Sequence, residues 1–126
     1  TGITDTMHYN AIPGVVYTNP EVAGIGETEE SANQKNIKYK IIKLPMTFAG
    51  RFVAENEGIN GLCKILVGVN NEKVIGVHML GNPCSEIIYG AGVAIEKRMT
   101  VQELKEVVFP HPTVGEIFKE TINTLD

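Results

Sequence analysis

The chain lacks the excess of basic residues and the long apolar runs that nucleic-acid-binding and membrane-spanning proteins need. It holds no tryptophan, and its 11 lysine and arginine residues are outnumbered by 15 aspartate and glutamate residues, which gives a net charge of -4. An acidic chain offers no basic surface for phosphate backbones or anionic lipids. No apolar run approaches the roughly 20 residues that cross a bilayer. We therefore expect neither nucleic acid nor a membrane as a partner.

The chain is also poor in cysteine and histidine, the residues most often used for redox chemistry and metal binding. Cys63 and Cys84 lie far apart and form no paired motif, and Cys63 falls in a strand-like run where a buried structural thiol is the commoner interpretation. The spacing of the three histidines does not support a zinc site. His78 lies within a strand-like run and is expected to be structural. His8 belongs to segment 1–8, which is expected to be a mobile or linker segment.

Two sequence patterns that would place the chain in a particular setting are missing. The first residues lack the basic-then-apolar layout of a signal peptide, so we expect a soluble, cytoplasmic protein. A dinucleotide site of the Gly-x-Gly-x-x-Gly type needs three glycines between a strand and a helix. Gly24-Ile25-Gly26 lacks the third glycine. We therefore expect neither FAD nor NAD to be bound tightly by this chain alone.

What is present indicates one globular domain over residues 1–126. With 43% hydrophobic and 21% charged residues, a chain of this length can bury a substantial core. The apolar phase slips after residue 41, which predicts a bulge or a change of packing face there. The polar stretch 49–61 is expected to be a strand end followed by a turn. Other expected elements are strands over 12–18 and 22–25, a short helix that begins at Thr28 and ends near Asn36, and a strand from Ile37 onward.

The clearest local pattern is a β-hairpin, since the apolar runs 62–69 and 74–80 flank a short polar turn. Because both faces of these runs are mostly apolar, the two strands should lie centrally in an antiparallel sheet covered on at least part of both faces. A helix over 83–99 can cover it, and the capping box of Thr100 and Glu103 begins another helix. These elements predict an α+β fold, with a central antiparallel sheet of about five strands and flanking helices.

The helix over 83–99 carries a group of small residues that would let another backbone come close. Two interpretations are open: these residues pack on the chain's own sheet, or they form a dimer interface. We favour the dimer interface, because apolar residues surround the helix too widely for a single partner surface. The small residues are Gly90, Ala91, Gly92 and Ala94.

The segment 109–116 holds the most promising residues for chemistry. Pro110 and Pro112 flank His111, fix φ on both sides and keep the histidine on a stiff, non-helical segment. Thr113 and Glu116 have the spacing of a capping box, which predicts a helix from Thr113 through Ile122. A histidine beside a carboxylate can act as a general acid or base near neutral pH. From the residues alone, a surface loop histidine is the favoured interpretation of His111, and capping would compete with His111 for the oxygens of Glu116.

The order of these elements and their landmark residues resembles the C-terminal interface domain of the flavin-dependent disulfide reductases, and within them the dihydrolipoamide dehydrogenases. The resemblance extends from about Tyr9 to Ile122. Its landmarks are Ile12-Pro13, Val16 to Thr18, Pro20 to Ala23, Gly26, the hairpin strand over 74–81, His111-Pro112-Thr113 and Glu116.

The resemblance implies a homodimer in which each subunit also carries FAD and NAD domains, with lipoyl-bearing subunits of a larger complex as possible partners. The matching histidine, His111, would exchange a proton with thiols in the partner subunit's active site, and Glu116 would orient its imidazole. The backbone at His111 and Pro112 would approach the partner's flavin. These properties predict an oxidoreductase that oxidises dihydrolipoamide with NAD, in which this domain by itself is inactive and binds no cofactor.

Two positions depart from the family pattern. Many relatives carry a second histidine where this chain has Phe109, so any hydrogen bond made by that side chain is absent here. Gly115 often stands as serine in relatives, and glycine weakens a first helical turn by roughly 1 kcal/mol relative to alanine. A non-catalytic dimerisation or docking module of the same fold is the main alternative, and a small ligand-binding domain is a weaker one.

Overall fold

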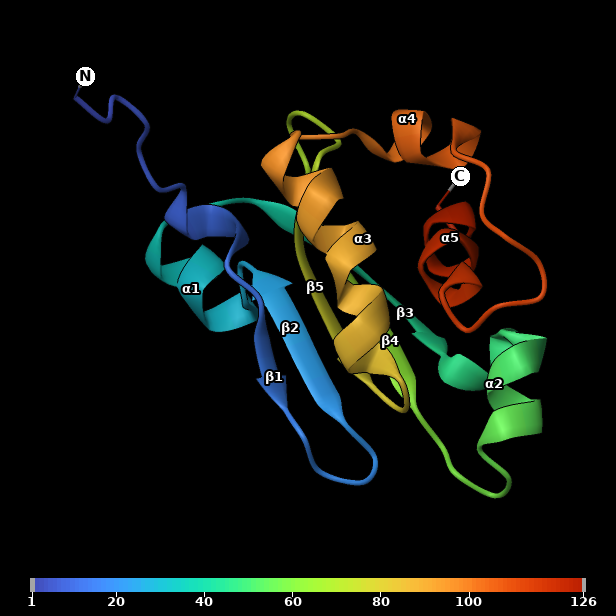
Figure 1. Cartoon of the computed structure of the whole chain (residues 1–126). Coiled ribbons are helices and arrows are strands. Elements are labelled where there is room, and N and C mark those ends of the chain that lie inside the picture. Colours follow the sequence, from blue (N-terminus) through green and yellow to red (C-terminus); the bar gives the residue numbers. More distant parts are fainter. Residues whose placement is uncertain (1, 126) are drawn as a thin grey trace.

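The computed structural model describes residues 2–125, and its centre is an antiparallel sheet of five strands in the order β1-β2-β5-β4-β3 (Figure 1). The predicted hairpin is confirmed: β4 and β5 pair at the middle of the sheet, where both strands have neighbours on each side. The α+β class with about five strands is confirmed as well. The strands are β1 (Gly14–Val16), β2 (Val22–Gly26), β3 (Tyr39–Pro45), β4 (Leu62–Gly68) and β5 (Val74–Leu80).

One face of the sheet carries the main core. Alternate residues of the strands, such as Ile65, Val77 and Met79, point to this face and pack against buried residues of the helices. In Figure 1 helix α3 lies across this face, with α4 and α5 beside it at the end where the chain finishes. The helices are α1 (Glu29–Gln34), α2 (Gly50–Glu55), α3 (Cys84–Glu96), α4 (Val101–Glu106) and α5 (Glu116–Asn123), with short 3-10 turns η1 (Tyr9–Ala11) and η2 (Met46–Phe48).

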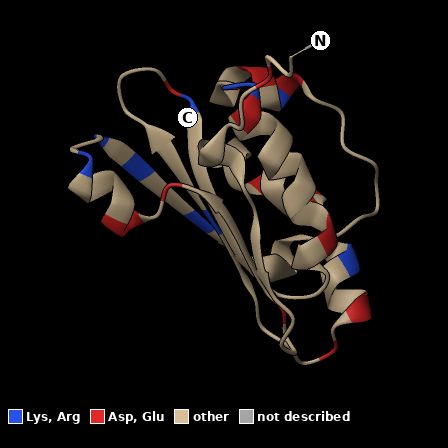
Figure 2. Ribbon diagram, turned by 60° about the vertical axis from the view of Figure 1, so that its left-hand side comes forward, with Lys and Arg blue, Asp and Glu red and all other residues tan. Residues whose placement is uncertain are grey.

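Part of the opposite face is covered by α1, which Figure 2 shows across the sheet from α3. Leu66 alternates with Ile65 and Val67, so it points to this second face, where it is fully buried. Ala32 of α1 is also fully buried, and neither residue belongs to the main core. Thr28 begins α1 as predicted, because its hydroxyl accepts from the amide of Ser31 while the Ser31 hydroxyl accepts from the amide of Thr28. The hairpin strands are therefore apolar on both faces because helices pack against both faces of the sheet.

Of the two alternatives expected after residue 41, the bulge is wrong and the change of packing face is present. Strand β3 pairs with β4 without interruption from Tyr39 to Pro45, and the irregularity lies instead between β4 and β5, at Leu66 and Val67. The apolar phase slips because Ile42 packs against the main core while its neighbour Ile41 is paired with Leu66 on the face that α1 covers. A strand with two apolar faces needs no bulge.

The strand end expected in the first part of residues 49–61 is wrong, because helix α2 occupies residues 50–55, while the expected turn follows at residues 57–58. The single fully buried side chain of α2 is Phe52. The Phe52 ring fits against the backbone at Gly81, where an added Cβ would lie 2.8 Å from ring atom Cε2. A helix of six residues with one buried side chain shows no apolar stripe in its sequence.

The small residues of α3 divide between the two interpretations of this helix. Ala91 and Ala94 are buried inside this chain, and an added Cβ at Gly92 would lie 3.1 Å from Ile25 of β2. These three residues let α3 approach its own sheet, so the interface placement is wrong for them. Gly90 lies with Tyr89 and Val93 on the exposed side of the helix, and a dimer interface on that side stays a prediction.

No helix within residues 2–125 is long and apolar enough to cross a membrane. Figure 2 shows acidic and basic residues distributed over several helices and strands. Residues 2–8 precede η1, and His8 contacts Glu96 of α3. The mobile or linker character expected for segment 1–8 stays a prediction, and Thr1 and Asp126 lie outside the described residues.

Candidate functional site

Helix α5 is the fixed element on which the candidate site is built. Ile117, Thr121 and Ile122 are buried, and α5 packs on β3, β4 and α4. The hydroxyl of Thr121 donates to the carbonyl of Ile117 at 2.7 Å, so its polar atom has a partner within the helix. The first residue of α5 is Glu116, whose side chain is therefore held by a helix anchored in the core.

The turn before α5 differs from the predicted capping box. The helix begins at Glu116 instead of Thr113, because the Thr113 hydroxyl donates to the carbonyl of Pro110 at 2.8 Å and does not accept from a helix amide. The other half of the box is present, since Glu116 Oε2 accepts from the amide of Thr113 at 2.9 Å. Both bonds close the chain around the intervening residues, and the His111-Pro112 peptide within this turn is cis.

His111 is bound to Glu116 at the same time. Its Nδ1 lies 2.8 Å from Glu116 Oε1. The expected competition between capping and histidine binding does not arise, since each role uses a different carboxylate oxygen. The His111 side chain is 80% exposed, whereas that of Glu116 is 19% exposed. The structure thus presents the imidazole to the outside while its orienting carboxylate lies mostly within the fold.

The electrostatics of the pair decide which nitrogen of His111 faces outward. The amide of Thr113, followed by the His111 side chain, lowers the pKa of Glu116 below its ordinary value. An ionised carboxylate only accepts hydrogen bonds, so Nδ1 of His111 must carry the proton that it shares with Glu116. In the neutral ring this leaves Nε2 with a free lone pair. The arrangement can therefore take up a proton at Nε2 and hold the resulting imidazolium beside an anion.

The segment that leads to His111 is also held by α5. The Phe109 and Phe118 rings meet edge to face, with centroids 6.2 Å apart, and the Lys119 ammonium group lies 5.8 Å from the Phe109 centroid. Lys119 also donates to the carbonyl of Val107. The sequence indicates that Phe118 lies in the helix but not that it contacts Phe109, because only the fold places α5 along this segment.

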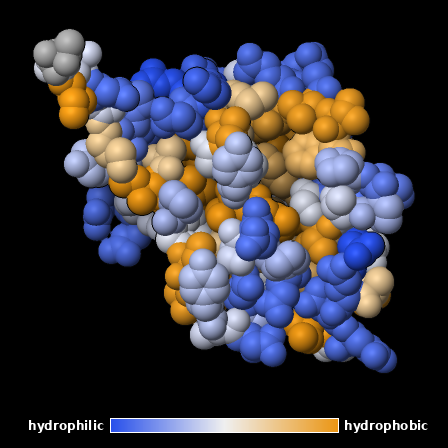
Figure 3. All heavy atoms as spheres, in the orientation of Figure 1, coloured by the Kyte–Doolittle hydropathy of each residue, from blue (hydrophilic) through white to orange (hydrophobic). Residues whose placement is uncertain are grey.

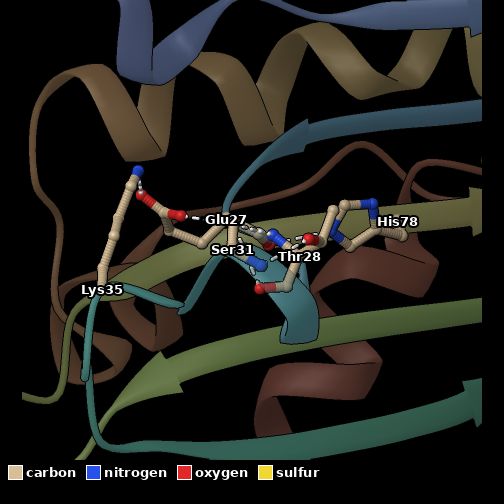
Figure 4. A network of polar contacts seen from close by, with 5 residues as sticks. All are labelled: Glu27, Thr28, Ser31, Lys35 and His78. Carbon is tan, nitrogen blue, oxygen red and sulfur yellow. Dashed lines mark hydrogen bonds and ion pairs between the residues drawn. The ribbon is translucent and has the colours of Figure 1, made fainter. Parts of the chain in front are cut away.

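His78 has a structural partner, as expected from the sequence. His78 Nε2 lies 2.9 Å from the carbonyl of Glu27, which joins β5 to the start of α1 (Figure 4). The Glu27 carboxylate in turn accepts from Ser31 and Lys35. Burial raises the pKa of Glu27, but the Lys35 and Ser31 hydrogen bonds outweigh burial and bring that pKa below its ordinary value. This network fastens α1 to the sheet.

Metal and thiol chemistry find little support in the described residues. Within residues 2–125, no three His, Cys, Asp or Glu side chains are grouped so that they could hold a metal ion. Cys63 and Cys84 are both free and buried. Burial raises the pKa of the Cys63 thiol to about 12, and burial together with the Glu21 carboxylate raises that of Cys84 to about 11. Thiols with such pKa values are poor nucleophiles near neutral pH.

Comparison with known sequences gives one family. Residues 12–122 match the family described as pyridine nucleotide-disulphide oxidoreductase, dimerisation domain. The mitochondrial dihydrolipoyl dehydrogenase of Caenorhabditis elegans is 38% identical over 114 residues, which are 90% of this chain and 23% of that protein. Leghemoglobin reductase of Glycine max is 35% identical over 120 residues, 95% of this chain and 23% of that protein. The chain thus spans less than a quarter of the length of these curated relatives.

Comparison with solved structures gives the same fold. LpdA from Mycobacterium tuberculosis superposes with a TM-score of 0.87 at 24% identity, over 97% of this chain and 26% of that one. The HOCl-induced flavoprotein disulfide reductase RclA from Escherichia coli superposes with a TM-score of 0.83 at 20% identity, over 91% of this chain and 26% of that one. At these identities the two structures support the fold alone.

Proposed function

The chain belongs to the pyridine nucleotide-disulphide oxidoreductases as their dimerisation domain, and from this premise we propose that it donates His111 and Glu116 to the active site of a partner subunit. The enzyme would be a dihydrolipoamide dehydrogenase, which carries this chain as its C-terminal interface domain. The parent subunit would also contain FAD and NAD domains, and its substrate would be a dihydrolipoyl group that is oxidised with NAD.

One observation carries the proposal: an imidazole that is 80% exposed is oriented by a carboxylate that is only 19% exposed. A surface loop histidine would also be exposed, but it would not need a carboxylate held within the fold to orient its ring. Here, among residues 2–125, Glu116 is the hydrogen-bond partner found for the His111 ring, and Nε2 is directed away from it. The arrangement suits a base that acts on a group supplied by another polypeptide.

The proposed chemistry is a proton transfer. A dihydrolipoyl thiol gives its proton to Nε2 of His111, which leaves a thiolate and an imidazolium paired with the Glu116 carboxylate. The thiolate attacks one sulfur of the partner subunit's redox disulfide, forms a mixed disulfide and releases the other sulfur as a thiolate. The imidazolium can return its proton to a leaving thiolate. Charge and atoms balance without any change in the oxidation state of this domain.

Flavin would lie close to this site in the dimer. His111 and Pro112 are exposed, so their backbone could lie against an uncharged ring system. The nearby Glu116 is ionised, and its negative charge would repel a pyrophosphate. These residues fit a contact with the isoalloxazine ring of the partner's FAD, while its phosphates would be held by other domains. When bound, the flavin accepts the electrons that the dithiol releases.

Partners and location follow from the same proposal. A homodimer is required, because the histidine and the redox disulfide come from different subunits. Lipoyl-bearing subunits of a larger complex are possible further partners. Several similar dihydrolipoyl dehydrogenases are named as mitochondrial, so the cytoplasmic location expected from the sequence stays a prediction.

The experiment uses a chimeric enzyme in which residues 12–122 replace the matching domain of the Caenorhabditis elegans dihydrolipoyl dehydrogenase. Turnover of dihydrolipoamide with NAD is compared between this chimera and its His111→Gln variant. Loss of general acid/base catalysis is expected to lower kcat about 100-fold or more. Flavin absorbance and dimer mass are measured for both proteins, so that loss of assembly is recognised. Near-normal turnover of His111→Gln would favour the non-catalytic docking module instead.

A further inference from the structure

Residues in the first turn of α5 contact the segment between α4 and α5 at several points. Glu116 binds His111 and the Thr113 amide. Three residues farther on, Lys119 lies over the Phe109 ring and donates to the carbonyl of Val107. Contacts from a single helical turn therefore reach both the histidine and the residues that precede it.

Phe109 is the inward-facing member of an apolar run at this end of the molecule. Val108 is 89% exposed, whereas Phe109 packs against the main core and Phe118 is buried. Figure 3 shows hydrophobic side chains gathered at the upper right, over α4 and the chain that follows it. Because the neighbouring valines are exposed, the Phe109 ring is the side chain of this run that packs against α5.

The position of the Phe109 ring is transmitted to His111 through a stiff connection. Pro110 lies between the two residues and Pro112 follows, so φ is fixed at both proline positions. The Thr113 hydroxyl bond to Pro110 closes the same short segment. Few backbone rotations remain that could move the imidazole while the Phe109 ring stays in place.

We propose that Phe109, held between Phe118 and Lys119, is a positioning residue that keeps His111 on Glu116. The inference rests on the proposed function of the His111-Glu116 pair. Phe109 touches neither substrate nor cofactor in this account; it acts through His111. Without the Phe109 ring, the His111 imidazole would separate from Glu116 more often. The neutral ring would then carry its proton on Nε2 in a larger fraction of molecules.

The first test measures the His111 tautomer in the chain itself. Nitrogen-15 shifts of the imidazole distinguish the Nδ1-protonated form, which Glu116 enforces, from the Nε2-protonated form. Phe109→Leu is expected to raise the ratio of Nε2-protonated to Nδ1-protonated ring by about 2- to 10-fold, the range that corresponds to an edge-to-face aromatic pair. Phe109→Tyr keeps a ring and should retain the wild-type ratio. Phe48→Leu is the matched control, since Phe48 is 62% exposed.

A second variant keeps the proposal falsifiable if Phe109→Leu does not fold. Lys119→Met removes the ammonium group from a partly exposed side chain and leaves its length nearly unchanged. It should raise the same tautomer ratio, while amide spectra show that α5 is retained. An unchanged ratio in every variant that folds would overturn the proposal.

A third measurement separates this inference from the proposed function. In the chimeric enzyme, Phe109→Leu should lower kcat several-fold while KM is nearly unchanged, and Phe109→Tyr should restore kcat. If His111→Gln leaves turnover intact, the proposed function fails, yet the tautomer ratios still decide whether Phe109 positions His111. If His111→Gln abolishes turnover but Phe109→Leu changes neither kcat nor the tautomer, this inference alone fails.

Discussion

Glu116 divides its carboxylate between two partners: Oε1 lies 2.8 Å from Nδ1 of His111, and Oε2 lies 2.9 Å from the amide of Thr113. One bond orients a side chain, and the other fixes the backbone turn that carries it. The same carboxylate therefore connects the folding of this turn to the direction of the imidazole. Because the donors on both oxygens stabilise the ionised form, the carboxylate is negatively charged wherever the proposed chemistry would run.

The first prediction concerns Glu116→Gln, which keeps the shape of the side chain and removes its charge. The amide can donate as well as accept, so Nδ1 is no longer required to carry the proton. We expect the neutral His111 ring to shift toward the Nε2-protonated form, as measured by nitrogen-15 shifts above pH 8. Glu120→Gln, on the exposed side of the same helix, is the control and should leave the tautomer as it is. An unaltered tautomer in Glu116→Gln would show that Glu116 does not orient the ring.

The second prediction concerns stability in acid. Glu27 has a lowered pKa in the folded chain because hydrogen bonds from Lys35 and Ser31 outweigh its burial. A carboxyl group of this kind stabilises the fold above its ordinary pKa of 4.5, and that contribution is lost as the pH falls through the lowered value. Glu27→Gln should therefore have a Tm that falls less steeply than the wild-type Tm between about pH 5 and pH 3. The exposed Glu57→Gln variant should follow the wild type. Parallel curves for Glu27→Gln and wild type would contradict the role given to this network.

The third prediction concerns the two thiols. With pKa values of about 12 for Cys63 and about 11 for Cys84, and with both side chains buried, neither should react with a disulfide reagent in the native chain at pH 8. Both should react at once when the chain is unfolded in guanidinium. The reaction is followed by absorbance of the released thiolate. Rapid stoichiometric reaction of the native chain would show that one thiol is accessible and ionised.

The fourth prediction tests helix α2, which the sequence did not indicate. Phe52→Ala should lower the free energy of unfolding by about 3–5 kcal/mol, because a fully buried ring leaves a cavity. Phe48→Ala removes an exposed ring four residues earlier and should change it by less than about 0.5 kcal/mol. Urea unfolding followed by circular dichroism measures both. Equal effects of the two substitutions would mean that α2 does not pack as described.

The elements that could be predicted are those whose pattern is complete within a few residues. The hairpin of β4 and β5 was visible because two apolar runs flank a polar turn. Helix α1 was visible because Thr28 precedes an acidic first turn, and α4 because Thr100 has a capping partner in Glu103. The turn before α5 shows the same spacing, yet the Thr113 hydroxyl takes the nearer carbonyl of Pro110. The capping-box spacing therefore predicted the bond between Glu116 and the Thr113 amide, but not the residue at which α5 begins.

What could not be predicted depends on contacts between distant parts of the chain. The two apolar faces of β3 make sense only once α1 is known to cover Leu66 on the second face. Small residues on α3 suggested another subunit, whereas Gly92 lies against Ile25 of the chain's own strand β2. For the site, His111 and Glu116 could be paired from their spacing, whereas the contact of Phe109 with Phe118 and Lys119 requires α5 to lie along the preceding segment.

The central claim is that His111 acts in the partner's active site, and complementation between inactive subunits tests it most directly. One chimeric subunit carries His111→Gln with its redox cysteines intact. The other keeps His111 but has both redox cysteines of the host enzyme replaced by serine. Each forms an inactive homodimer, and differently tagged subunits allow the heterodimer to be purified.

Dihydrolipoamide oxidation by the purified heterodimer is the measurement. If the histidine acts across the interface, one of its two sites is complete, and about half of the wild-type activity should return. If the histidine acts within its own subunit, neither site is complete. A heterodimer no more active than its two parent homodimers would contradict the account.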